Sequence, residues 1–449
     1  MFARRIAVVG TGYVGLTTGA CLASLGHHVI CADVDEDKIR RLRDGKVDIL
    51  EPGLSELVVE GLAAGRLSFT VGAAVALEQH AEGVEVVFLC VPTPMGVGGV
   101  ADLRAVEAVL DEIRDTLPSG CVIVNKSTVP VGTAVRTAEL LGRSDVAVTS
   151  NPEFLREGTA VRDFLNPDRI VVGGEAQDAA ERVAALYSRL GAPTVLTDSA
   201  SAELVKYAAN GFLAMKLSYV NAVAELCERL GADILDVTEG MSYDRRIGRE
   251  FLNPGPGWGG SCLPKDTQAL LQVADAADFE FRLMRASIDT NTRQRQRMVD
   301  KIRLAVTGNR NGSLTHSRVA LLGLTFKAGT NDLRDSPALV IAALLRQAGA
   351  ELVGYDPALP ASTSHPDLEG IELAADAYAA LAQADAAVVL TEWPEFRTLD
   401  WPRIAGLMGT ARVIDTRNLL DGDVLTRAGL TWTGVGRRQA VDAAVLAGQ

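Results

Sequence analysis

The chain has 449 residues, of which 48% are hydrophobic and 22% charged, a composition that can bury apolar cores and is not that of a disordered chain. Its 44 lysines and arginines and its 57 aspartates and glutamates give a net charge of −13, which argues against nucleic acid or an anionic membrane as the main partner. At about 150 residues per domain, the length predicts about three domains.

Histidine and cysteine are both scarce. The five histidines include no pair at metal-ligand spacing, so we predict no bound metal and no Ser-His-Asp triad. The six cysteines include no C-x-x-C pair, and a chain of this length needs no disulfide framework, which fits a reducing, cytoplasmic setting. Because no apolar run approaches the roughly 20 residues of a membrane helix, the protein is expected to be soluble.

The first two hundred residues alternate short runs rich in Val and Ile with stretches of helical periodicity such as Tyr13–Leu25 and Asp102–Thr116. Unbroken apolar strands separated by helices are typical of a parallel sheet that is covered on both faces. The predicted strands of this region are Arg5–Val9, His28–Asp33, Leu67–Val71, Glu85–Val91, Cys121–Lys126 and Val146–Thr149.

A glycine-rich turn follows the first strand and opens the first helix: Gly10, Thr11, Gly12, Tyr13, Val14 and Gly15. The first glycine permits a tight turn, the second lets a pyrophosphate approach the backbone, and the third allows the helix to pack closely on the sheet. Asp33 ends the second strand, where a carboxylate accepts hydrogen bonds from both ribose hydroxyls and repels a 2′-phosphate. The motif predicts an NAD site; the alternative is a glycine-rich turn of another kind of α/β protein.

The pattern changes after residue 200. Ser201–Leu230 is about thirty residues without proline, compatible with one helix of roughly 45 Å, and such a helix indicates a connector or a dimerisation element. A polar, turn-rich linker follows at Thr307–Ser317. Beyond it, Arg318–Leu324 and Glu351–Asp356 repeat the opening order of strand, helix and a strand that ends in aspartate.

This weak internal repeat predicts an α/β fold with two Rossmann-like, doubly wound domains, joined by a long central helix and a helical dimerisation region. Ala386–Leu390 and Val413–Asp415 supply further strands of the second α/β domain. The predicted domains are residues 1–200, which bind NAD, residues 201–306, which are helical, and residues 307–449. Because the last domain lacks the glycines of the first, it need not bind the same ligand.

Cys262 differs from the other cysteines because it lies in a loop too rich in Gly and Pro for regular structure. The neighbouring Lys265 could favour the thiolate, which is the reactive form. Next to a nicotinamide site, a thiolate suggests oxidation of an aldehyde to an acid, because a thiohemiacetal can lose hydride to become a thioester. The alternative is a structural cysteine in a glycine loop.

Four further residues are candidates for the same chemistry. Lys206 and Asn210 share one face of the long helix, where they could stabilise an oxyanion, although Lys206 could equally be a surface lysine. Glu153 follows a strand and could activate the water that hydrolyses a thioester; otherwise it is a loop carboxylate that caps a helix. Thr128 also follows a strand and is a candidate cofactor or water contact.

The assembled motifs resemble those of the nucleotide-sugar 6-dehydrogenases, and among them the UDP-glucose type, over nearly the whole chain. The resemblance implies an NAD-dependent, two-step, four-electron oxidation of UDP-glucose to UDP-glucuronate. The motifs that carry it are GTGYVG at 10–15, CVPTP at 90–94, KSTVPVGT at 126–133, NPEFLREG at 151–158, KYAAN at 206–210, YDRRIG at 243–248, NPGPGWGGSCLPKD at 253–266, GLTFKAGTNDLRDSP at 323–337 and DTRN at 415–418.

The resemblance also implies roles for single residues. Cys262 would be the nucleophile, Glu153 would handle thioester hydrolysis, and Lys206, Asn210, Asp266 and Thr128 would polarise oxygen, orient water and relay protons. Cofactor contacts would be Gly10, Thr11, Gly12, Tyr13, Val14, Gly15, Asp33, Lys38, Thr93, Thr128, Glu157, Lys265 and Arg334. Substrate contacts would be Glu153, Phe154, Leu155, Arg156, Glu157, Lys206, Asn210, Arg246, Asn253, Pro254, Gly255, Pro256, Gly257, Trp258, Gly259, Phe326, Lys327 and Arg417.

The resemblance further implies that residues 307–449 bind the UDP-sugar and that Arg246 can reach in from a neighbouring subunit of a homodimer or higher homo-oligomer. Trp258 departs from the Tyr or Phe that is usual in the family, and it could narrow the sugar pocket. Two other functions remain open: a β-hydroxyacid dehydrogenase, which would need neither Cys262 nor a second α/β domain, and a non-catalytic NAD-sensing or scaffold protein.

Overall fold

The computed structural model describes residues 3–79, 83–96 and 101–438. The chain divides into two compact units, the first made of Met1–Ala209 with Gln268–Phe279 and the second of Asn210–Thr267 with Glu280–Gln449. His80 lies outside the described residues, and so do residues 439–449 at the end of the predicted last domain. The predicted domain limits at 200 and 306 stay predictions.

The first unit contains an eight-stranded sheet, counted over the described residues, in the order β3-β2-β1-β4-β5-β6-β7-β8. Each predicted strand of this region forms, with ends that shift by up to two residues. The strands are β1 (Arg5–Val9), β2 (His28–Asp33), β3 (Leu67–Val71), β4 (Val86–Leu89), β5 (Val122–Asn125), β6 (Ala147–Ser150), β7 (Ile170–Gly174) and β8 (Thr194–Thr197).

The sheet differs from the predicted all-parallel sheet at one edge. Strand β7 pairs antiparallel with β6, whereas β7 and β8 are parallel to each other. Gly174 lies opposite Thr149 in this pairing, and a Cβ atom on Gly174 would lie 2.9 Å from the Thr149 Cγ2 atom. The two strands approach closely because glycine has no side chain at this position, a feature that hydrophobic patterning alone does not reveal.

Helices cover both faces of this sheet, as predicted. Alternate residues of β1 show the two layers: Ile6 and Val8 belong to a core that α1, α3, α7 and α8 share, whereas Ala7 and Val9 belong to a core that α4 and α5 share. The helices are α1 (Tyr13–Ser24), α2 (Glu36–Arg43), α3 (Leu54–Ala63), α4 (Ala73–Glu78), α5 (Arg104–Ile113), α6 (Thr133–Leu141), α7 (Ala160–Leu165) and α8 (Gln177–Ala185).

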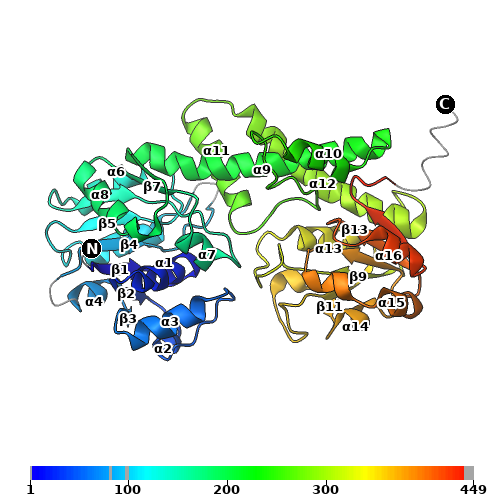
Figure 1. The fold of residues 1–449 in the computed structure, drawn as a ribbon, viewed down its shortest axis with the longest axis horizontal. Coiled ribbons are helices and arrows are strands. Elements are labelled where there is room, and N and C mark those ends of the chain that lie inside the picture. The colour runs from blue at the N-terminus through cyan, green and yellow to red at the C-terminus, as the bar shows by residue number, and fades with distance from the viewer. Residues whose placement is uncertain (1–2, 80–82, 97–100, 439–449) are drawn as a thin grey trace. The chain divides into compact units, whose positions relative to one another are not determined.

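The second unit contains a six-stranded parallel sheet over the described residues, in the order β11-β10-β9-β12-β13-β14. It is the yellow-to-red part of Figure 1. Its strands are β9 (Arg318–Leu322), β10 (Glu351–Tyr355), β11 (Ile371–Leu373), β12 (Ala386–Val389), β13 (Arg412–Asp415) and β14 (Thr431–Gly434). Its helices are α13 (Pro337–Gln347), α14 (Ala377–Leu381), α15 (Trp401–Leu407) and α16 (Gly422–Arg427).

The long helix α9 (Ser199–Leu230) begins two residues before its predicted start and is continuous in Figure 1. It is followed by α10 (Ile234–Ser242), α11 (Leu263–Ala276) and α12 (Arg282–Thr307). Two doubly wound α/β sheets and a long central helix confirm the predicted fold class. Among the described residues, no helix combines the length and apolar character needed to cross a membrane.

Candidate active site

The glycine-rich turn after β1 has the geometry of a dinucleotide site. Gly10 has φ +97°, and a Cβ atom on Gly15 would lie 1.8 Å from the Gly10 carbonyl oxygen. Both positions therefore require glycine because of the backbone of the turn itself, whether or not a ligand binds. A Cβ atom on Gly12, in contrast, would meet no atom within 4 Å. Gly12 immediately precedes α1, so its open backbone face suits a pyrophosphate that binds at the helix N-terminus. The turn therefore fits NAD.

Asp33, at the end of β2, is tied to this turn. Its Oδ2 atom accepts hydrogen bonds from the Thr11 N–H at 2.8 Å, from the Thr11 hydroxyl at 2.6 Å and from the Lys38 ammonium at 3.1 Å. Burial by itself raises the pKa of Asp33, but the Thr11, Asp35 and Lys38 donors outweigh it and hold the pKa below its usual range. The structure thus keeps an ionised carboxylate where ribose hydroxyls would bind.

Tyr13 links the turn to the loop that follows β6. Its hydroxyl donates to the Glu51 carboxylate, and both groups accept a hydrogen bond from the Gly158 N–H, at 2.8 Å and 2.7 Å. Burial, together with the Glu51 charge, raises the pKa of Tyr13 well above its usual range. Glu51 is buried in the structure. No sequence pattern singled it out, because it lies between two predicted strands.

Glu153 and Lys206 form a buried ion pair in the first unit. The Glu153 Oε1 and Lys206 Nζ atoms lie 2.8 Å apart, and their side chains are 6% and 4% exposed. The Leu155 N–H donates to the other carboxylate oxygen at 2.6 Å. Burial by itself raises the pKa of Glu153, but Lys206 and the Leu155 N–H outweigh it and hold the pKa below its usual range. Glu153 is therefore a proton acceptor beside an ammonium that can stabilise an oxyanion.

Lys126 is a second buried lysine near Glu153 that the sequence did not single out. Its ammonium donates to the Asn151 Oδ1 atom at 3.1 Å, and the Tyr187 hydroxyl donates to the same oxygen at 2.6 Å. Burial lowers the pKa of Lys126 to about 8. Lys126, Glu153 and Tyr187 all line a cavity of about 210 Å³, which is several times the roughly 30 Å³ that one water occupies. The cavity can hold water next to Glu153.

Two other predicted residues of the first unit also meet. The Thr93 hydroxyl donates to the Thr128 carbonyl at 2.8 Å, which joins the segments that follow β4 and β5. Phe154 lies under the guanidinium of Arg169, with 3.6 Å between the Arg169 Cζ atom and the ring centroid. The exposed Arg156 pairs with Asp163 at 2.6 Å. The loop from Glu153 to Glu157 is therefore held at several points by residues of its own unit.

Cys262 lies in the second unit, immediately before the 14-residue helix α11. Its carbonyl accepts the Asp266 N–H at 2.9 Å, and a helix N-terminus of this kind favours negative charge. The buried Asp266 carboxylate accepts from the Asn210 amide at 2.5 Å and from the Lys265 ammonium at 2.7 Å. Cys262 is partly exposed, whereas the other five cysteines are buried. The structure thus brings an accessible thiol and a buried Asp266–Asn210 pair to one helix end.

The glycine-rich loop before Cys262 is held by buried polar side chains on α9 and α12. Asn221 accepts the Gly255 N–H at 2.8 Å, and Gln294 donates to the Gly255 carbonyl at 2.7 Å. Asn291 accepts the Trp258 N–H at 2.8 Å and donates to the Trp258 carbonyl at 3.0 Å. Amide side chains on long helices look like surface residues in the sequence, so none of the three was predicted.

The close approach of this loop to the second sheet requires glycine. A Cβ atom on Gly259 would lie 2.0 Å from the Asp335 carbonyl, and one on Gly260, which has φ +84°, would lie 2.6 Å from the Phe326 ring. Trp258 is 5% exposed, and its indole N–H donates to the Ser218 hydroxyl at 2.9 Å. Its predicted effect on the sugar pocket stays a prediction.

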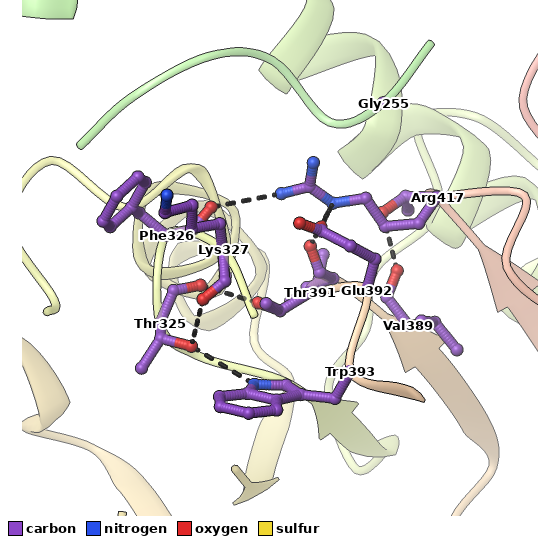
Figure 2. Close-up of polar contacts among 12 residues, drawn as sticks. Gly255, Thr325, Phe326, Lys327, Val389, Thr391, Glu392, Trp393 and Arg417 are labelled. Atoms are coloured by element: carbon purple, nitrogen blue, oxygen red, sulfur yellow. Dashed lines mark hydrogen bonds and ion pairs between the residues drawn. The ribbon is translucent and has the colours of Figure 1, made fainter. Parts of the chain in front are cut away.

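Arg417 and Lys327 lie near one another at the carboxyl ends of β9, β12 and β13, as Figure 2 shows. Arg417 donates from Nε to the Leu390 carbonyl at 2.8 Å and from Nη2 to the Phe326 carbonyl at 3.4 Å. The Lys327 ammonium lies 5.5 Å from the centroid of the Phe326 ring. Two cations and an aromatic ring at this edge of a doubly wound sheet suit a nucleotide diphosphate.

The turn after β9 differs from the turn after β1 in a way that fits the predicted difference in ligands. Asp356, at the end of β10, accepts the N–H groups of Leu324 and Thr325 at 2.7 and 2.9 Å. The Trp393 indole donates to the same carboxylate at 3.2 Å. The Leu324 N–H bond repeats the bond from the Thr11 N–H to Asp33, so the two turns differ instead in their glycines: Thr325 and Ala328 stand where the first turn has Gly12 and Gly15.

Two residues with predicted contacts, Arg246 and Arg334, have exposed side chains that pair with a carboxylate two residues away in the sequence. Arg246 pairs with Asp244 at 2.6 Å and its side chain is 89% exposed. Arg334 pairs with Asp332 at 2.6 Å and its side chain is 63% exposed. The predicted cofactor contact of Arg334 and the predicted intersubunit contact of Arg246 stay predictions.

Comparison with known proteins gives matches over nearly the whole chain. Three domain models of the UDP-glucose/GDP-mannose dehydrogenase family match in chain order: the NAD binding domain over residues 4–191, the central domain over residues 200–293 and the UDP binding domain over residues 320–422. A UDP-glucose 6-dehydrogenase of Rhizobium meliloti is 43% identical over 443 residues, which cover 96% of this chain and 99% of the relative.

Two solved structures are similar throughout. A UDP-glucose dehydrogenase of the archaeon Pyrobaculum islandicum has a TM-score of 0.84 and 35% identity, and the match covers 97% of this chain and 98% of that one. A UDP-D-ManNAc dehydrogenase of Pyrococcus horikoshii also has a TM-score of 0.84, with 28% identity, and the match covers 96% of this chain and 99% of that one. Because these two dehydrogenases are named for different sugars and have equal TM-scores, the fold alone does not indicate which sugar this chain oxidises.

Proposed function

Because the chain belongs to the UDP-glucose/GDP-mannose dehydrogenase family, we propose that it oxidises the C6 alcohol of UDP-glucose to the carboxylate of UDP-glucuronate. It is an NAD-dependent oxidoreductase, and the turn from Gly10 to Gly15 with Asp33 provides the cofactor site. The observation that carries the proposed chemistry is the position of Cys262, partly exposed and one helical turn before the buried Asp266.

Conversion of the alcohol to a carboxylate removes four electrons and adds one oxygen atom from water. NAD would supply the hydride acceptor when bound, so the overall reaction consumes two NAD and one water and releases two NADH and three protons. The first oxidation gives an aldehyde. The Cys262 thiolate then adds to the aldehyde, so the second hydride leaves a thiohemiacetal and a thioester remains. Water cleaves the thioester and regenerates the thiol.

The side chains have separate roles in this proposal. Lys206 stabilises negative charge on the substrate oxygen, and the buried Asn210 and Asp266 orient water and move protons near Cys262. Glu153 takes a proton from the water that attacks the thioester, and the cavity beside it supplies room for that water. Thr128 assists through water. The buried state of the Glu153–Lys206 pair supports these roles, because an ion pair is retained there despite the cost of removing two charges from water.

In this proposal the substrate's UDP group binds at the edge of the second sheet. Arg417 and Lys327 neutralise the diphosphate, and Phe326 and the Asn253–Gly259 loop complete the site. Lys38, Glu157, Lys265 and Arg334 remain proposed cofactor contacts. Six free cysteines fit a reducing setting, and we place the protein in the cytoplasm.

Product stoichiometry tests the function. We expect two NADH per UDP-glucose consumed, with UDP-glucuronate as the product, when purified protein is followed at 340 nm, the NADH absorbance band, on limiting substrate. Parallel assays with GDP-mannose and UDP-N-acetylmannosamine should give much lower kcat/KM. One NADH with release of a ketone would indicate a hydroxyacid-type dehydrogenase instead. No NADH with any of the three sugars, despite NAD binding, would favour a non-catalytic NAD-sensing protein.

The exposed face of α9 supports a homodimer. Phe212, Tyr219 and Leu226 follow at intervals of seven residues and are 59%, 56% and 51% exposed. Met215 and Ala222 lie between them, so the five residues alternate steps of three and four, as in a coiled-coil seam. An apolar stripe of this regularity matches a second copy of itself, and we propose that α9 packs against α9 of a partner subunit, which would also allow Arg246 to act in the neighbouring site.

We expect Tyr219→Asp to weaken this dimer at least tenfold, because a carboxylate would be buried without a partner in the seam. Sedimentation equilibrium or light scattering across protein concentrations measures the change. Val424→Asp on α16 is the matched control, since Val424 is also an exposed apolar residue, at 40%, but lies off the seam. If both variants keep the oligomeric state of the wild type, α9 is not the contact.

A further inference from the structure

Glu392 lies beside Arg417 at the proposed UDP site and has no role in the chemistry above. It follows β12 in the segment Thr391-Glu392-Trp393, and Figure 2 shows its carboxylate pointing toward the Arg417 guanidinium. The Glu392 Oε2 and Arg417 Nε atoms lie 3.1 Å apart, and the side chains are 40% and 17% exposed. The carboxylate is therefore an internal counter-ion next to a cation that is expected to bind phosphate.

Arg417 is also held by contacts other than the one to Glu392. Two backbone carbonyls, of Leu390 and Phe326, accept from the Nε and Nη2 atoms of the guanidinium. The backbone N–H of Arg417 is held by the Asp415 carboxylate at 3.0 Å. The Glu392 Oε2 atom is buried against the guanidinium but accepts no hydrogen bond. Glu392 thus adds negative charge to the site, whereas the hydrogen bonds that hold the Arg417 guanidinium come from backbone carbonyls.

The segment that carries Glu392 is anchored on both sides. The Thr391 hydroxyl donates to the Thr325 carbonyl at 2.6 Å, and the Trp393 indole donates to Asp356 at 3.2 Å and to the Thr325 hydroxyl at 3.3 Å. These bonds hold the main chain, so the carboxylate stays close to Arg417 (Figure 2). The Glu392 side chain is 40% exposed, so it also borders the solvent from which an anion would approach.

We propose that Glu392 is a competing counter-ion that weakens the binding of the UDP diphosphate to Arg417 and so speeds the exchange of product for substrate. The inference rests on the proposed function, because it concerns the UDP subsite of that reaction. Substrate and product carry the same UDP group, and the product has gained a negative carboxylate. Without this counter-ion, Arg417 would hold both ligands more tightly without lowering the barrier to chemistry, since uniform binding does not raise kcat.

The test is the binding of UDP alone, measured by isothermal calorimetry, to the wild type and to Glu392→Gln. We expect the variant to bind UDP roughly three- to tenfold more tightly, and the gain to shrink in high salt, because one repelling charge at a partly exposed site has been removed. KM for UDP-glucose should fall by a similar factor without an increase in kcat. Glu395→Gln is the matched control: it removes the same charge three residues away, where Glu395 accepts the Tyr355 hydroxyl, and should leave UDP binding unchanged.

Weaker UDP binding by Glu392→Gln would make Glu392 a residue that positions Arg417, and unchanged binding would make it irrelevant to the nucleotide; either result overturns the inference. Equal tightening by Glu395→Gln would overturn it too, because the effect would then be general to the surface charge. Glu392→Ala provides a second variant and should also tighten binding. These outcomes leave the proposed function intact if the wild type still yields two NADH per UDP-glucose, and a failure of that assay would not by itself change the UDP titration.

Discussion

Replacement of Cys262 by alanine is expected to stop formation of the carboxylate, with a loss of turnover on the order of 10⁴-fold or more. The reason is that without the thiolate the aldehyde cannot become a thioester, so the second hydride has no covalent intermediate from which to leave. Because Cys262 is partly exposed and no core depends on it, the variant should fold. The measurements are NADH release on UDP-glucose, the thermal midpoint of unfolding and NAD binding by fluorescence titration.

Cys227→Ala is the control for Cys262→Ala. Cys227 lies in the same unit, is 4% exposed and packs in the apolar core with Val220 and Ile302, so its loss should cost about 1 kcal/mol of stability and leave turnover unchanged. Normal two-NADH turnover by Cys262→Ala would remove the thioester from the mechanism. Loss of NAD binding in that variant would show instead that the substitution damages the fold.

Most of the architecture could be predicted from the sequence because its signals are local. Gly10, Gly12 and Gly15 follow a run of buried strand residues and precede a helix, and Asp33 ends the next strand, so motif and periodicity agree. The stretch without proline likewise predicted α9 to within two residues of its start. Strands β7 and β8 were missed and their direction is opposite to that of the others, because direction depends on pairing between segments and not on the residues of one segment.

In the candidate site, too, some residues could be predicted from the sequence and others could not. Cys262, Glu153 and Lys206 could be singled out because each is a reactive residue type in an unusual context, a glycine loop, a strand end and an apolar helix. The side chains that hold such residues could not. Asn221 and Gln294 resemble ordinary surface amides until the fold buries them against the Gly255 backbone.

Polar contacts between distant segments could not be predicted from the sequence either. Glu51 meets Tyr13, and Glu392 meets Arg417, only after the sheets form, because a hydrogen bond or an ion pair between distant segments leaves no mark in local spacing. Lys126 is a related case: next to Thr128 it reads as a polar residue after a strand, and only its burial shows that it places a second positive charge near Glu153. Sequence patterns therefore reveal the reactive groups, and the structure reveals what sets their orientation and charge.

Glu153→Gln is expected to separate oxidation from hydrolysis. Without a carboxylate to accept a proton from water, cleavage of the thioester should slow by about 10²- to 10³-fold, while both hydride transfers still occur. A rapid-mixing experiment should then give a burst of about two NADH per active site, followed by slow turnover. Intact-mass spectrometry of the quenched protein should show one UDP-glucuronyl adduct, and digestion should locate it on Cys262.

The control for Glu153→Gln must reproduce its structural cost, because glutamine cannot accept at both positions. Lys206 and the Leu155 N–H each donate to one Glu153 oxygen, so the amide group of glutamine would face one of these donors. Glu203→Gln creates the same conflict elsewhere: Glu203 is buried on α9 and accepts the Gly132 and Ala134 N–H groups. Both variants should lose stability, but only Glu153→Gln should accumulate the adduct. An adduct in neither variant, with hydrolysis as fast as in the wild type, would assign the proton acceptor to another residue.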